Sequence, residues 1–343
     1  MWARDSCVSL IGATAARGTA GRYKKVFCKS LETLASRQTR NGQIPNAVDF
    51  VGSIDAPATY ATIDSSLWFV LGEYFYRKCF GLALWKKHAK NIGAAMKWVE
   101  FQDTGEDLLP EQQPTSDWMD CFPHKYGHTI NTQALYYAAL KATNGTEDKV
   151  NVGKFVKQVN CKLWDDSLGY YLPWHWKDHN EYSEKEFWFD SLGNMLAIAF
   201  GLASRKQARR ILSFADEMEI NRPYPLRAIY PPISRGSKPW KDYFDASLAG
   251  KEHSYINGGI WPYIGGFYVC ALIEAGQGSK AQEELELLAK ANSLGKKLSW
   301  DFNEWISPVT GTPEGGRHQV WSAGAYMLAH EAVESKRNPL AIG

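Results

Sequence analysis

The chain has 343 residues, of which 45% are hydrophobic, so it can bury a large core in one or two domains. Its 39 basic and 37 acidic residues are spread evenly and give a formal charge of +2, which excludes the electrostatic footprint of a protein that binds nucleic acid, an anionic membrane or a polyanionic substrate. Aromatic residues are numerous, with 14 Trp, 17 Tyr and 15 Phe, and aromatic faces in a cleft suit the apolar faces of sugar rings.

Helical periodicity recurs along the whole chain, whereas the alternation typical of strands is scarce. We expect eleven helices, over residues 5–16, 22–40, 64–79, 81–101, 129–143, 149–163, 188–203, 205–219, 261–276, 279–296 and 317–334. One kind is apolar or small on most faces, as in Ser191–Gly201, and the other is amphipathic with a charged face, as in Arg205–Glu217. A helix that is apolar all round is buried, and a helix with one charged face lies at the surface.

The two kinds of helix alternate along the chain, beginning with a buried one. This alternation predicts helical hairpins arranged in a ring, with the buried helices inside and the amphipathic helices outside. Eleven helices counted in this way predict an all-α, (α/α)6 toroid that lacks its first outer helix, built from residues 1–343 as a single domain. The open outer edge is a candidate surface for a second copy of the chain. An α-solenoid also repeats helix pairs, but it does not need long aromatic loops before every second helix.

Long connections lead into each following buried helix, while short links leave it. They cover residues 41–63, 102–128, 164–187, 218–260 and 297–316, and all are expected at one end of the ring, where long loops are usually functional. One contains Asp117 and Asp120 beside Trp118, and another contains Glu304 beside a Trp. A carboxylic acid that protonates a leaving oxygen and a carboxylate that activates water are the minimum needed to hydrolyse a glycosidic bond. The residues alone do not choose between Asp117 and Asp120 as the acid.

Further candidates for sugar contacts stand where the connections enter the buried helices. Asp64 opens the second buried helix, either as an N-terminal cap or as a partner for sugar hydroxyls. Residues 254–262, with the sequence Ser-Tyr-Ile-Asn-Gly-Gly-Ile-Trp-Pro, enter the fifth, either as a structural turn or as backbone that approaches a ligand. Gln319 and Trp321 begin the sixth and are expected to face the centre of the ring.

Several other classes of site are not indicated by the sequence. The six cysteines fall singly at irregular spacing, and we find no metal-ligand pattern, Ser/His/Asp triad, phosphate loop or dinucleotide glycine motif, so neither a metal nor a cofactor is expected. No signal segment opens the chain and no run of 18 apolar residues occurs, which predicts a cytoplasmic protein that does not span a membrane. The predicted partner is a small oligosaccharide.

Segments spread over the whole chain resemble the six-hairpin glycosidases, which include the glucosidase domain of glycogen debranching enzymes, the processing α-glucosidase I relatives and the alkaline/neutral invertases. Trp2-Ala-Arg-Asp-Ser6 is similar to the family's W-G-R-D-T/S, Asn41-Gly-Gln-Ile-Pro-Asn46 to G-L-I-P-N, and Ile63-Asp-Ser-Ser-Leu-Trp-Phe69 to V-D-A-T-L-W-F. Ser116–Cys121 is similar to T-W-M-D, Glu304–Gly311 to E-x-Y-x-P-x-T-G, and Gln319–Gly324 to Q-x-W-S. Asn257–Pro262 looks like H-N-G-x-x-W-P, although Ile256 stands where the His is expected.

The resemblance implies that Asp120 is the general acid and Glu304 the general base of a hydrolysis that inverts the anomeric carbon. The sugar site expected with them consists of Arg4, Asp5, Asp64, Trp68, Trp118, Asn257, Trp261, Gln319 and Trp321. The expected activity is that of a glycosidase on an α-glucosidic bond of a small oligosaccharide or a glucan end, like an amylo-α-1,6-glucosidase or an α-glucosidase. Two alternatives stay open: an invertase-like sucrose hydrolase, which the Asn257–Pro262 segment favours, and a non-catalytic sugar-binding toroid.

Overall fold

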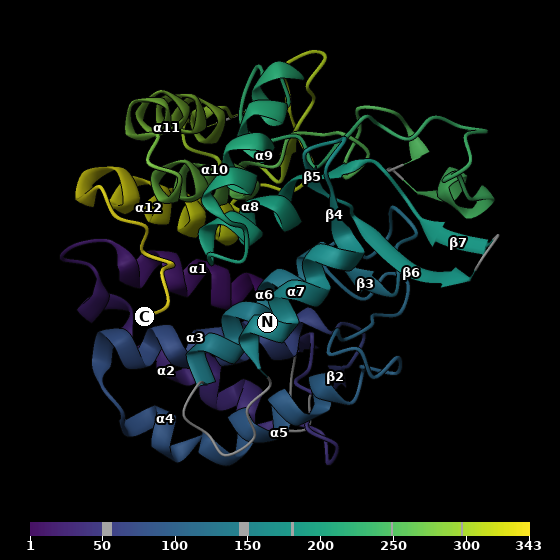
Figure 1. Cartoon of the computed structure of the whole chain (residues 1–343). Coiled ribbons are helices and arrows are strands. Elements are labelled where there is room, and N and C mark those ends of the chain that lie inside the picture. The colour runs from purple at the N-terminus through teal and green to yellow at the C-terminus, as the bar shows by residue number, and fades with distance from the viewer. Residues whose placement is uncertain (50–56, 144–150, 180–181, 248–249, 296–297) are drawn as a thin grey trace.

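The computed structural model describes residues 1–49, 57–143, 151–179, 182–247, 250–295 and 298–343. Within these residues the chain forms twelve α-helices, joined by connections that carry short strands (Figure 1). Six helices form the inner set. Five are buried on most faces: α1 (Ala3–Ala15), α3 (Asp64–Phe80), α6 (Ile130–Thr143), α8 (Ser191–Ala199) and α10 (Pro262–Glu274), and the sixth, α12 (Val320–Ser335), is buried along one face. The others are α2 (Ala20–Ser36), α4 (Ala83–Lys87), α5 (Ala89–Glu100), α7 (Val152–Leu163), α9 (Arg205–Glu217) and α11 (Gly278–Ser293).

The sequence pattern explains why the two sets of helices are buried differently. In α8 every residue is buried, because its side chains are apolar or small apart from Asn194, which bonds backbone carbonyls. In α9 the buried residues are Ala208, Ile211, Leu212 and Ala215, which is the spacing of one apolar stripe on a helix. The outer helices therefore cover the inner ones with a single face and leave their charged faces in water.

The buried helices form a closed inner ring. Each packs against the next in the order α1, α3, α6, α8, α10 and α12, and α12 packs back against α1. Small residues allow the closest crossing, because a Cβ on Gly12 of α1 would lie 1.9 Å from the carbonyl oxygen of Gly324 in α12. Outside the ring, α2 packs on α1 and α3, α5 on α3, α7 on α6, and α11 on α10 and α12. The predicted lack of a first outer helix stays a prediction.

One helix prediction was wrong. The helix expected over residues 81–101 is divided into α4 and α5, because His88 leaves the helical conformation with ψ of 13°. Its ring nitrogen Nδ1 instead lies 2.6 Å from the buried carboxylate of Glu73 in α3. The predicted helix ends at residues 149–150 and 296–297 lie outside the described residues.

Short antiparallel strands tie the long connections together. β1 (Ala47–Val48) pairs with β2 (Ala58–Thr59), β4 (Trp164–Asp165) with β5 (Tyr170–Tyr171), β8 (Phe189–Asp190) with β9 (Ile229–Tyr230), and β10 (Trp305–Ile306) with β11 (Pro313–Glu314). β3 (His128–Thr129), β6 (Trp174–His179) and β7 (Tyr182–Lys185) form a three-stranded sheet. The alternation typical of strands is scarce in the sequence, in agreement with strands that, apart from β6 and β7, have only two residues each and so carry no detectable period.

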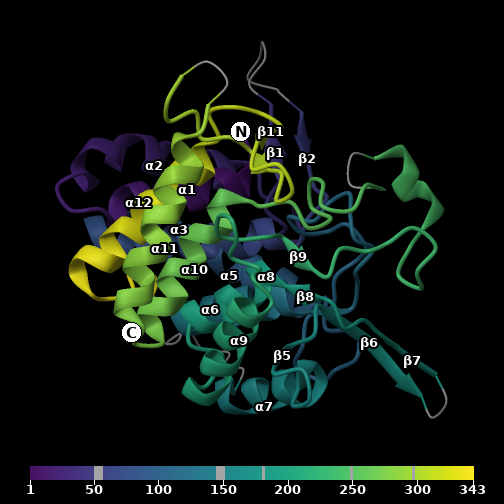
Figure 2. The same cartoon turned by 90° about the horizontal axis from the view of Figure 1, so that it is seen from above.

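The β6–β7 hairpin projects beyond the helices, as does the connection with the 3₁₀ helix η1 (Asp242–Ala246). Both lie on the right in Figures 1 and 2, and the two views together place them at the same end of the molecule. Among the described residues, no helix combines the length and the apolar character that crossing a membrane requires.

Candidate active site

The first residues of the inner helices meet at one end of the ring. Arg4 in α1 bonds Asp64 in α3, and the ring of Tyr263 in α10 stacks on that of Trp321 in α12, with centroids 4.2 Å apart. Burial raises the pKa of the Tyr263 hydroxyl, while the charge of Arg4 lowers it and that of Asp64 raises it. Helices α1, α3, α10 and α12 therefore share one surface, and the connections that precede them gather around it.

Arg4 and Asp64 form a buried, two-point ion pair. Arg4 Nε donates to Asp64 Oδ2 at 2.7 Å, and Arg4 Nη2 donates to Oδ1 at 3.2 Å. Burial lowers the pKa of Arg4, but the charge and hydrogen bonds of Asp64, together with the charge of Asp5, raise it more and leave the pKa above its usual value, so the guanidinium stays charged. Asp64 makes no capping bond to α3, which removes the capping interpretation. Asp5 is half-buried beside this pair, and burial raises the pKa of its carboxyl.

Asp117 is fully buried and is committed to the protein itself. Its carboxylate lies 2.9 Å from Lys125 Nζ, which lies 2.9 Å from Asp190 as well, and all three side chains are 0% exposed. Asp117 also accepts from the backbone N–H of Met119 at 2.9 Å, and Asp190 caps α8 through the N–H of Gly193. The Asp117–Lys125–Asp190 triad thus joins the connection that contains Asp120 to an inner helix.

Asp120, three residues further on, is open to solvent rather than paired. Part of its carboxyl is nevertheless surrounded by protein atoms, and this partial burial raises the pKa of Asp120. Arg4 opposes the increase, while Asp117 and Asp64 add to it. Of the two candidate acids, Asp120 is the one that a substrate can reach.

Glu304 lies just before β10 and is held by two donors. The backbone N–H of Gly316 donates to Oε2 at 2.8 Å, and the Tyr255 hydroxyl donates to Oε1 at 3.4 Å. Gly315 leaves the space for this carboxylate, because a Cβ there would lie 2.4 Å from Glu304 Oε2. The strand is anchored in turn, since the N–H groups and carbonyls of Ile260 and Ile306 exchange two hydrogen bonds.

The charges of Glu304 and Asp120 both act on Tyr255. Burial, then the charges of Glu304, Cys121 and Asp120, raise the pKa of the Tyr255 hydroxyl, so both carboxylates act on a single group. The neighbouring thiol gives the same result, because burial and then Asp120 raise the pKa of Cys121 to about 12, with a further contribution from Glu304. Two connections far apart in the sequence therefore bring Asp120 and Glu304 to one place.

Backbone strain is found in the same connections. Residues other than glycine that have a left-handed conformation there include Thr115 (φ 61°), His253 (φ 61°), Tyr255 (φ 48°), Phe302 (φ 48°) and His318 (φ 60°). Such conformations cost on the order of 1–3 kcal/mol each and cluster at functional sites. Their position on both sides of Tyr255 and Glu304 agrees with a functional role for this end of the ring.

Predicted aromatic residues pack together in a buried cluster, which we call the aromatic floor. Trp118 packs edge-on against Trp261 and Tyr263, with centroids 5.5 and 5.4 Å away, and Trp261 meets Trp321 at 5.9 Å. Trp68 is also buried and packs against Phe267. Within the described residues, the indole N–H groups of Trp118 and Trp321 and the hydroxyl of Tyr263 have no hydrogen-bond partner. The floor thus offers donors to a bound hydroxyl, while most of its ring surface is already packed.

Asn257 and Gln319 lie in different settings. Asn257 is 0% exposed, and its amide pairs with the backbone N–H and carbonyl of Ile233 at 2.7 and 2.9 Å. It fastens one connection to another, and we leave it out of the proposed sugar site. Gln319 is the N-cap residue of α12 and lies beside the Glu304 carboxylate, since a Cβ on Gly316 would be 3.0 Å from its Nε2 and 3.6 Å from Glu304 Oε2.

Four residues of this region were not predicted from the sequence: Lys125, Asp190, Tyr255 and Tyr263. Tyr255 and Tyr263 lie in or next to the segment 254–262, so the signal was the segment itself. The sequence gave no signal for Lys125 and Asp190, because a single charged residue in a loop usually lies on the solvated surface.

A closed ring of helical hairpins, with carboxylates and aromatic side chains at the N-termini of its inner helices, defines the six-hairpin glycosidase superfamily. Within it, the chain belongs to the amylo-α-1,6-glucosidase family, whose sequence model matches residues 1–328.

Solved structures share this fold. The GH63 mannosylglycerate hydrolase of Thermus thermophilus, in complex with Tris and D-glycerate, has a TM-score of 0.70 at 14% identity, over 95% of this chain and 92% of that chain. A bacterial glucoamylase in complex with acarbose has a TM-score of 0.64 at 15% identity, over 100% of this chain and 50% of that chain. These likenesses confirm the predicted (α/α)6 toroid as a mostly helical fold.

Curated relatives include several plant invertases. Alkaline/neutral invertase E of Arabidopsis thaliana is 23% identical over 321 residues, which cover 78% of this chain and 51% of the relative. Cytosolic invertase 1 of Oryza sativa subsp. japonica is 24% identical over 332 residues, which cover 80% and 57%. The chain spans about half the length of the curated relatives it matches.

Proposed function

We propose that the chain hydrolyses a glycosidic bond with inversion, with Asp120 as general acid and Glu304 as general base. The observation that supports the proposal is that Glu304 accepts a hydrogen bond from Tyr255, whose pKa is raised by the charges of both Glu304 and Asp120. Inversion needs roughly 6.5–9.5 Å between the two carboxyl groups, so that a water molecule fits between Glu304 and the anomeric carbon.

Asp120 suits the role of the acid because it must carry a proton at the start of the reaction. Burial together with the negative charge of Asp117 and Asp64 raises the pKa of its carboxyl, which favours the protonated form. Three buried carboxylates share two cations nearby, Arg4 and Lys125, so ionising Asp120 as well adds uncompensated negative charge. Its proton passes to the glycosidic oxygen as the bond to the anomeric carbon breaks.

Glu304 suits the role of the base because its carboxylate is accessible and is oriented by two donors. The Gly316 N–H and the Tyr255 hydroxyl fix its direction. It takes one proton from the water whose oxygen attacks the anomeric carbon from the opposite side. The products are a sugar of inverted configuration and the leaving alcohol.

The sugar undergoing cleavage is proposed to lie on the aromatic floor. Arg4 and Asp64 present fixed charges from α1 and α3, and Gln319 lies beside Glu304. The remaining contacts are proposed to come from Asp5, Trp68, Trp118, Trp261 and Trp321.

An α-linked glucosyl unit is the proposed substrate group, in one of two contexts. The relatives named as invertases favour sucrose, the alternative raised by the sequence. The family description favours an α-1,6-linked glucosyl end of a glucan. We test sucrose first, because the individual relatives that match the chain are invertases. A cytoplasmic location and a second copy of the chain at the outer edge stay predictions.

The test compares glucose release from sucrose, isomaltose and maltose by the unmutated chain and by Asp120→Asn and Glu304→Gln. Each variant should lose about 10²–10⁴-fold in kcat, the usual contribution of a general acid or base. Asp166→Asn, at an exposed carboxylate on the outer surface, is the matched control and should retain full activity. Proton NMR of the first product anomer tests inversion.

Equal turnover by all of these proteins would refute the roles of Asp120 and Glu304. Sugar binding by the unmutated chain without turnover of any sugar in a broad panel would favour the non-catalytic binding protein instead.

A further inference from the structure

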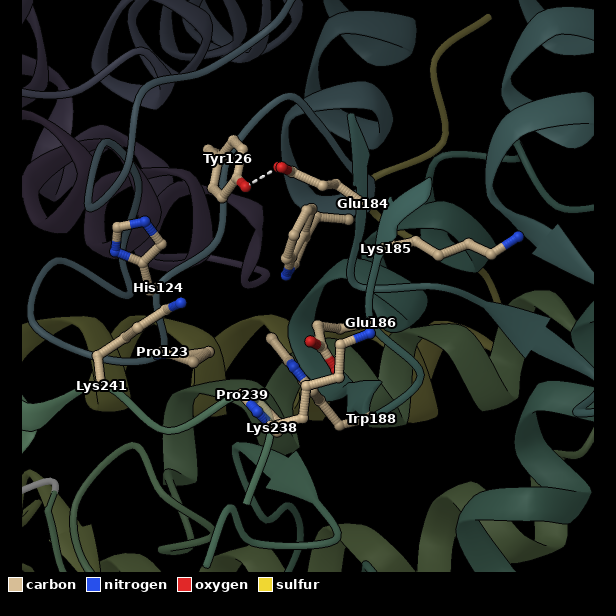
Figure 3. Close-up of a pocket in the computed structure, with 11 residues that line it drawn as sticks. Pro123, His124, Tyr126, Glu184, Lys185, Glu186, Trp188, Lys238, Pro239 and Lys241 are labelled. Carbon is tan, nitrogen blue, oxygen red and sulfur yellow. Dashed lines mark hydrogen bonds between the residues drawn. The ribbon is translucent and has the colours of Figure 1, made fainter. Parts of the chain in front are cut away.

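A cavity whose wall includes Pro123, three residues from Asp120, is lined by neither Asp120 nor Glu304. Its volume is about 370 Å³, which is within the usual range for ligand pockets. Three separate connections meet in its wall, contributing Pro123, His124 and Tyr126, then Trp174, Glu184–Glu186 and Trp188, then Lys238, Pro239 and Lys241 (Figure 3). The β6–β7 hairpin and the connection with η1, which project beyond the helices, supply two of these three parts.

An aromatic wall with an unused donor lines the cavity. The rings of Tyr126 and Trp174 lie 4.6 Å apart at 31°, and Trp188 lines the same space. Trp174 is 6% exposed, and its indole N–H has no hydrogen-bond partner in the described part of the chain. Leaving a buried donor unpaired costs on the order of 1–3 kcal/mol, and a bound hydroxyl would satisfy it.

Charges of both signs surround the aromatic wall. Glu184 accepts a hydrogen bond from the Tyr126 hydroxyl, and Figure 3 shows Glu184 and Glu186 together with Lys238 and Lys241 around the cavity. Burial raises the pKa of Glu186, while Lys238 and Lys241 lower it, so the amines lie near that carboxylate. Of the three lysines on the wall, Lys185 extends its amine away from the cavity in Figure 3, and the other two amines against two carboxylates do not select an ion. They offer donors and acceptors to a neutral ligand rich in hydroxyl groups.

The cavity is close to the proposed acid. Pro123, on its wall, is three residues from Asp120, so their Cα atoms are at most about 11 Å apart. Its neighbour His124 bonds the Tyr243 hydroxyl at 2.7 Å. His124 and Tyr126 also line another cavity, of about 270 Å³. A single saccharide bound at Asp120 can therefore extend into this space.

We propose that this cavity binds a neutral sugar residue of the substrate, remote from the bond that is cleaved. The ring would pack on Tyr126 and Trp174, one hydroxyl would accept from the Trp174 N–H, and others would pair with Glu186 and Lys238. The assignment of this cavity to the substrate of the hydrolysis rests on the proposed function, whereas the binding of a sugar at the cavity does not. The substrate class is then an oligosaccharide of three or more residues.

The test measures binding by calorimetry in the Asp120→Asn background, which preserves the sugar. Maltotriose, isomaltotriose and raffinose are the probes. Trp174→Phe removes the unpaired N–H and should weaken binding of the preferred trisaccharide about two- to tenfold, the usual range for one hydrogen bond. Trp164→Phe is the matched control, because the Trp164 N–H bonds Asp166 on the outer surface. Lys238→Ala, at an exposed site that does not endanger folding, should weaken binding as well, whereas Lys97→Ala should not.

Trisaccharide binding that is unchanged by Trp174→Phe and Lys238→Ala, or that is absent for all three probes, would overturn this inference. A chain that binds trisaccharides through Trp174 but turns over no sugar would refute the proposed function alone. Turnover that needs Asp120 and Glu304, with binding indifferent to the cavity variants, would refute the cavity alone.

Discussion

Lys125 provides the sharpest test of how the connection that bears Asp120 is held. Its ammonium lies 2.9 Å from both Asp117 and Asp190, and none of the three side chains is exposed. Burial lowers the pKa of Lys125, but the two carboxylates raise it more, so the ammonium stays charged. Lys125→Met keeps an unbranched apolar side chain in place and removes the charge, which leaves two buried carboxylates without their shared cation.

Breaking a buried pair by removing one partner costs about 3–5 kcal/mol. For 343 residues an unfolding entropy of about 2.1 cal/mol/K per residue amounts to about 0.7 kcal/mol/K. Lys125→Met should therefore lower the melting temperature by about 4–7 °C. The assay is thermal unfolding at neutral pH, followed by circular dichroism.

Two comparisons isolate the buried charge. Lys97→Ala removes the exposed pair with Glu100 and should shift the melting temperature by less than about 1.5 °C, because such pairs contribute about 0–1 kcal/mol. Adding Asp117→Asn and Asp190→Asn to Lys125→Met removes the unpaired carboxylates while keeping acceptors for the Met119 and Gly193 N–H groups, and should restore part of the loss. The reasoning fails if Lys125→Met melts like the unmutated chain, or if the triple variant melts no higher than the single one.

Asp120→Asn should stabilise the fold, because a carboxyl with a raised pKa costs the folded state free energy once it ionises. The gain in melting temperature should vanish below pH 3.8 and grow at higher pH. A gain that is independent of pH would contradict this prediction. Burial lowers the pKa of His128 to about 4, so the unfolded chain binds a proton at this residue before the folded chain does. The free energy of unfolding should therefore fall as the pH drops from 6.5 to about 4. Urea titrations of His128→Gln should show a smaller fall, and an equal fall would exclude His128 as the source of the pH dependence. Gly315→Ala should lower kcat about 10²-fold by displacing Glu304, because Gly315 has φ of 70° and no room for a Cβ. Gly21→Ala, in open space on α2, is the control and should keep full activity. A normal kcat in both variants would show that Glu304 adapts to the added methyl group.

Local residue patterns were sufficient to predict the helices and their inner or outer position. The buried stripe Ala208, Ile211, Leu212 and Ala215 is a property of α9 alone, and so is the apolar run of α8. The departure at His88 was not predictable, because it depends on Glu73, which lies on a different helix.

The role of each loop carboxylate could not be assigned in the same way. Asp117 and Asp120 share one apolar segment and have the same local signal, and only the resemblance to a family favoured Asp120. In the structure Asp117 bonds Lys125, whereas Asp120 stays open to solvent. Asn257 shows the same limit, because its sequence context suggests a ligand contact and its actual partner is the backbone of Ile233.

The sequence by itself determined the helical hairpins and the end of the ring at which the long connections gather, because hydrophobic period and loop length are encoded within each segment. Only the tertiary structure decided the closing contact of Gly12 with Gly324, the ion triad of Lys125 and the hydrogen bond of Tyr255 to Glu304. These contacts depend on side chains that are distant in sequence. Burial strengthens the interaction between charges and shifts their pKa values, and the partners that decide the outcome are not encoded in any local sequence pattern.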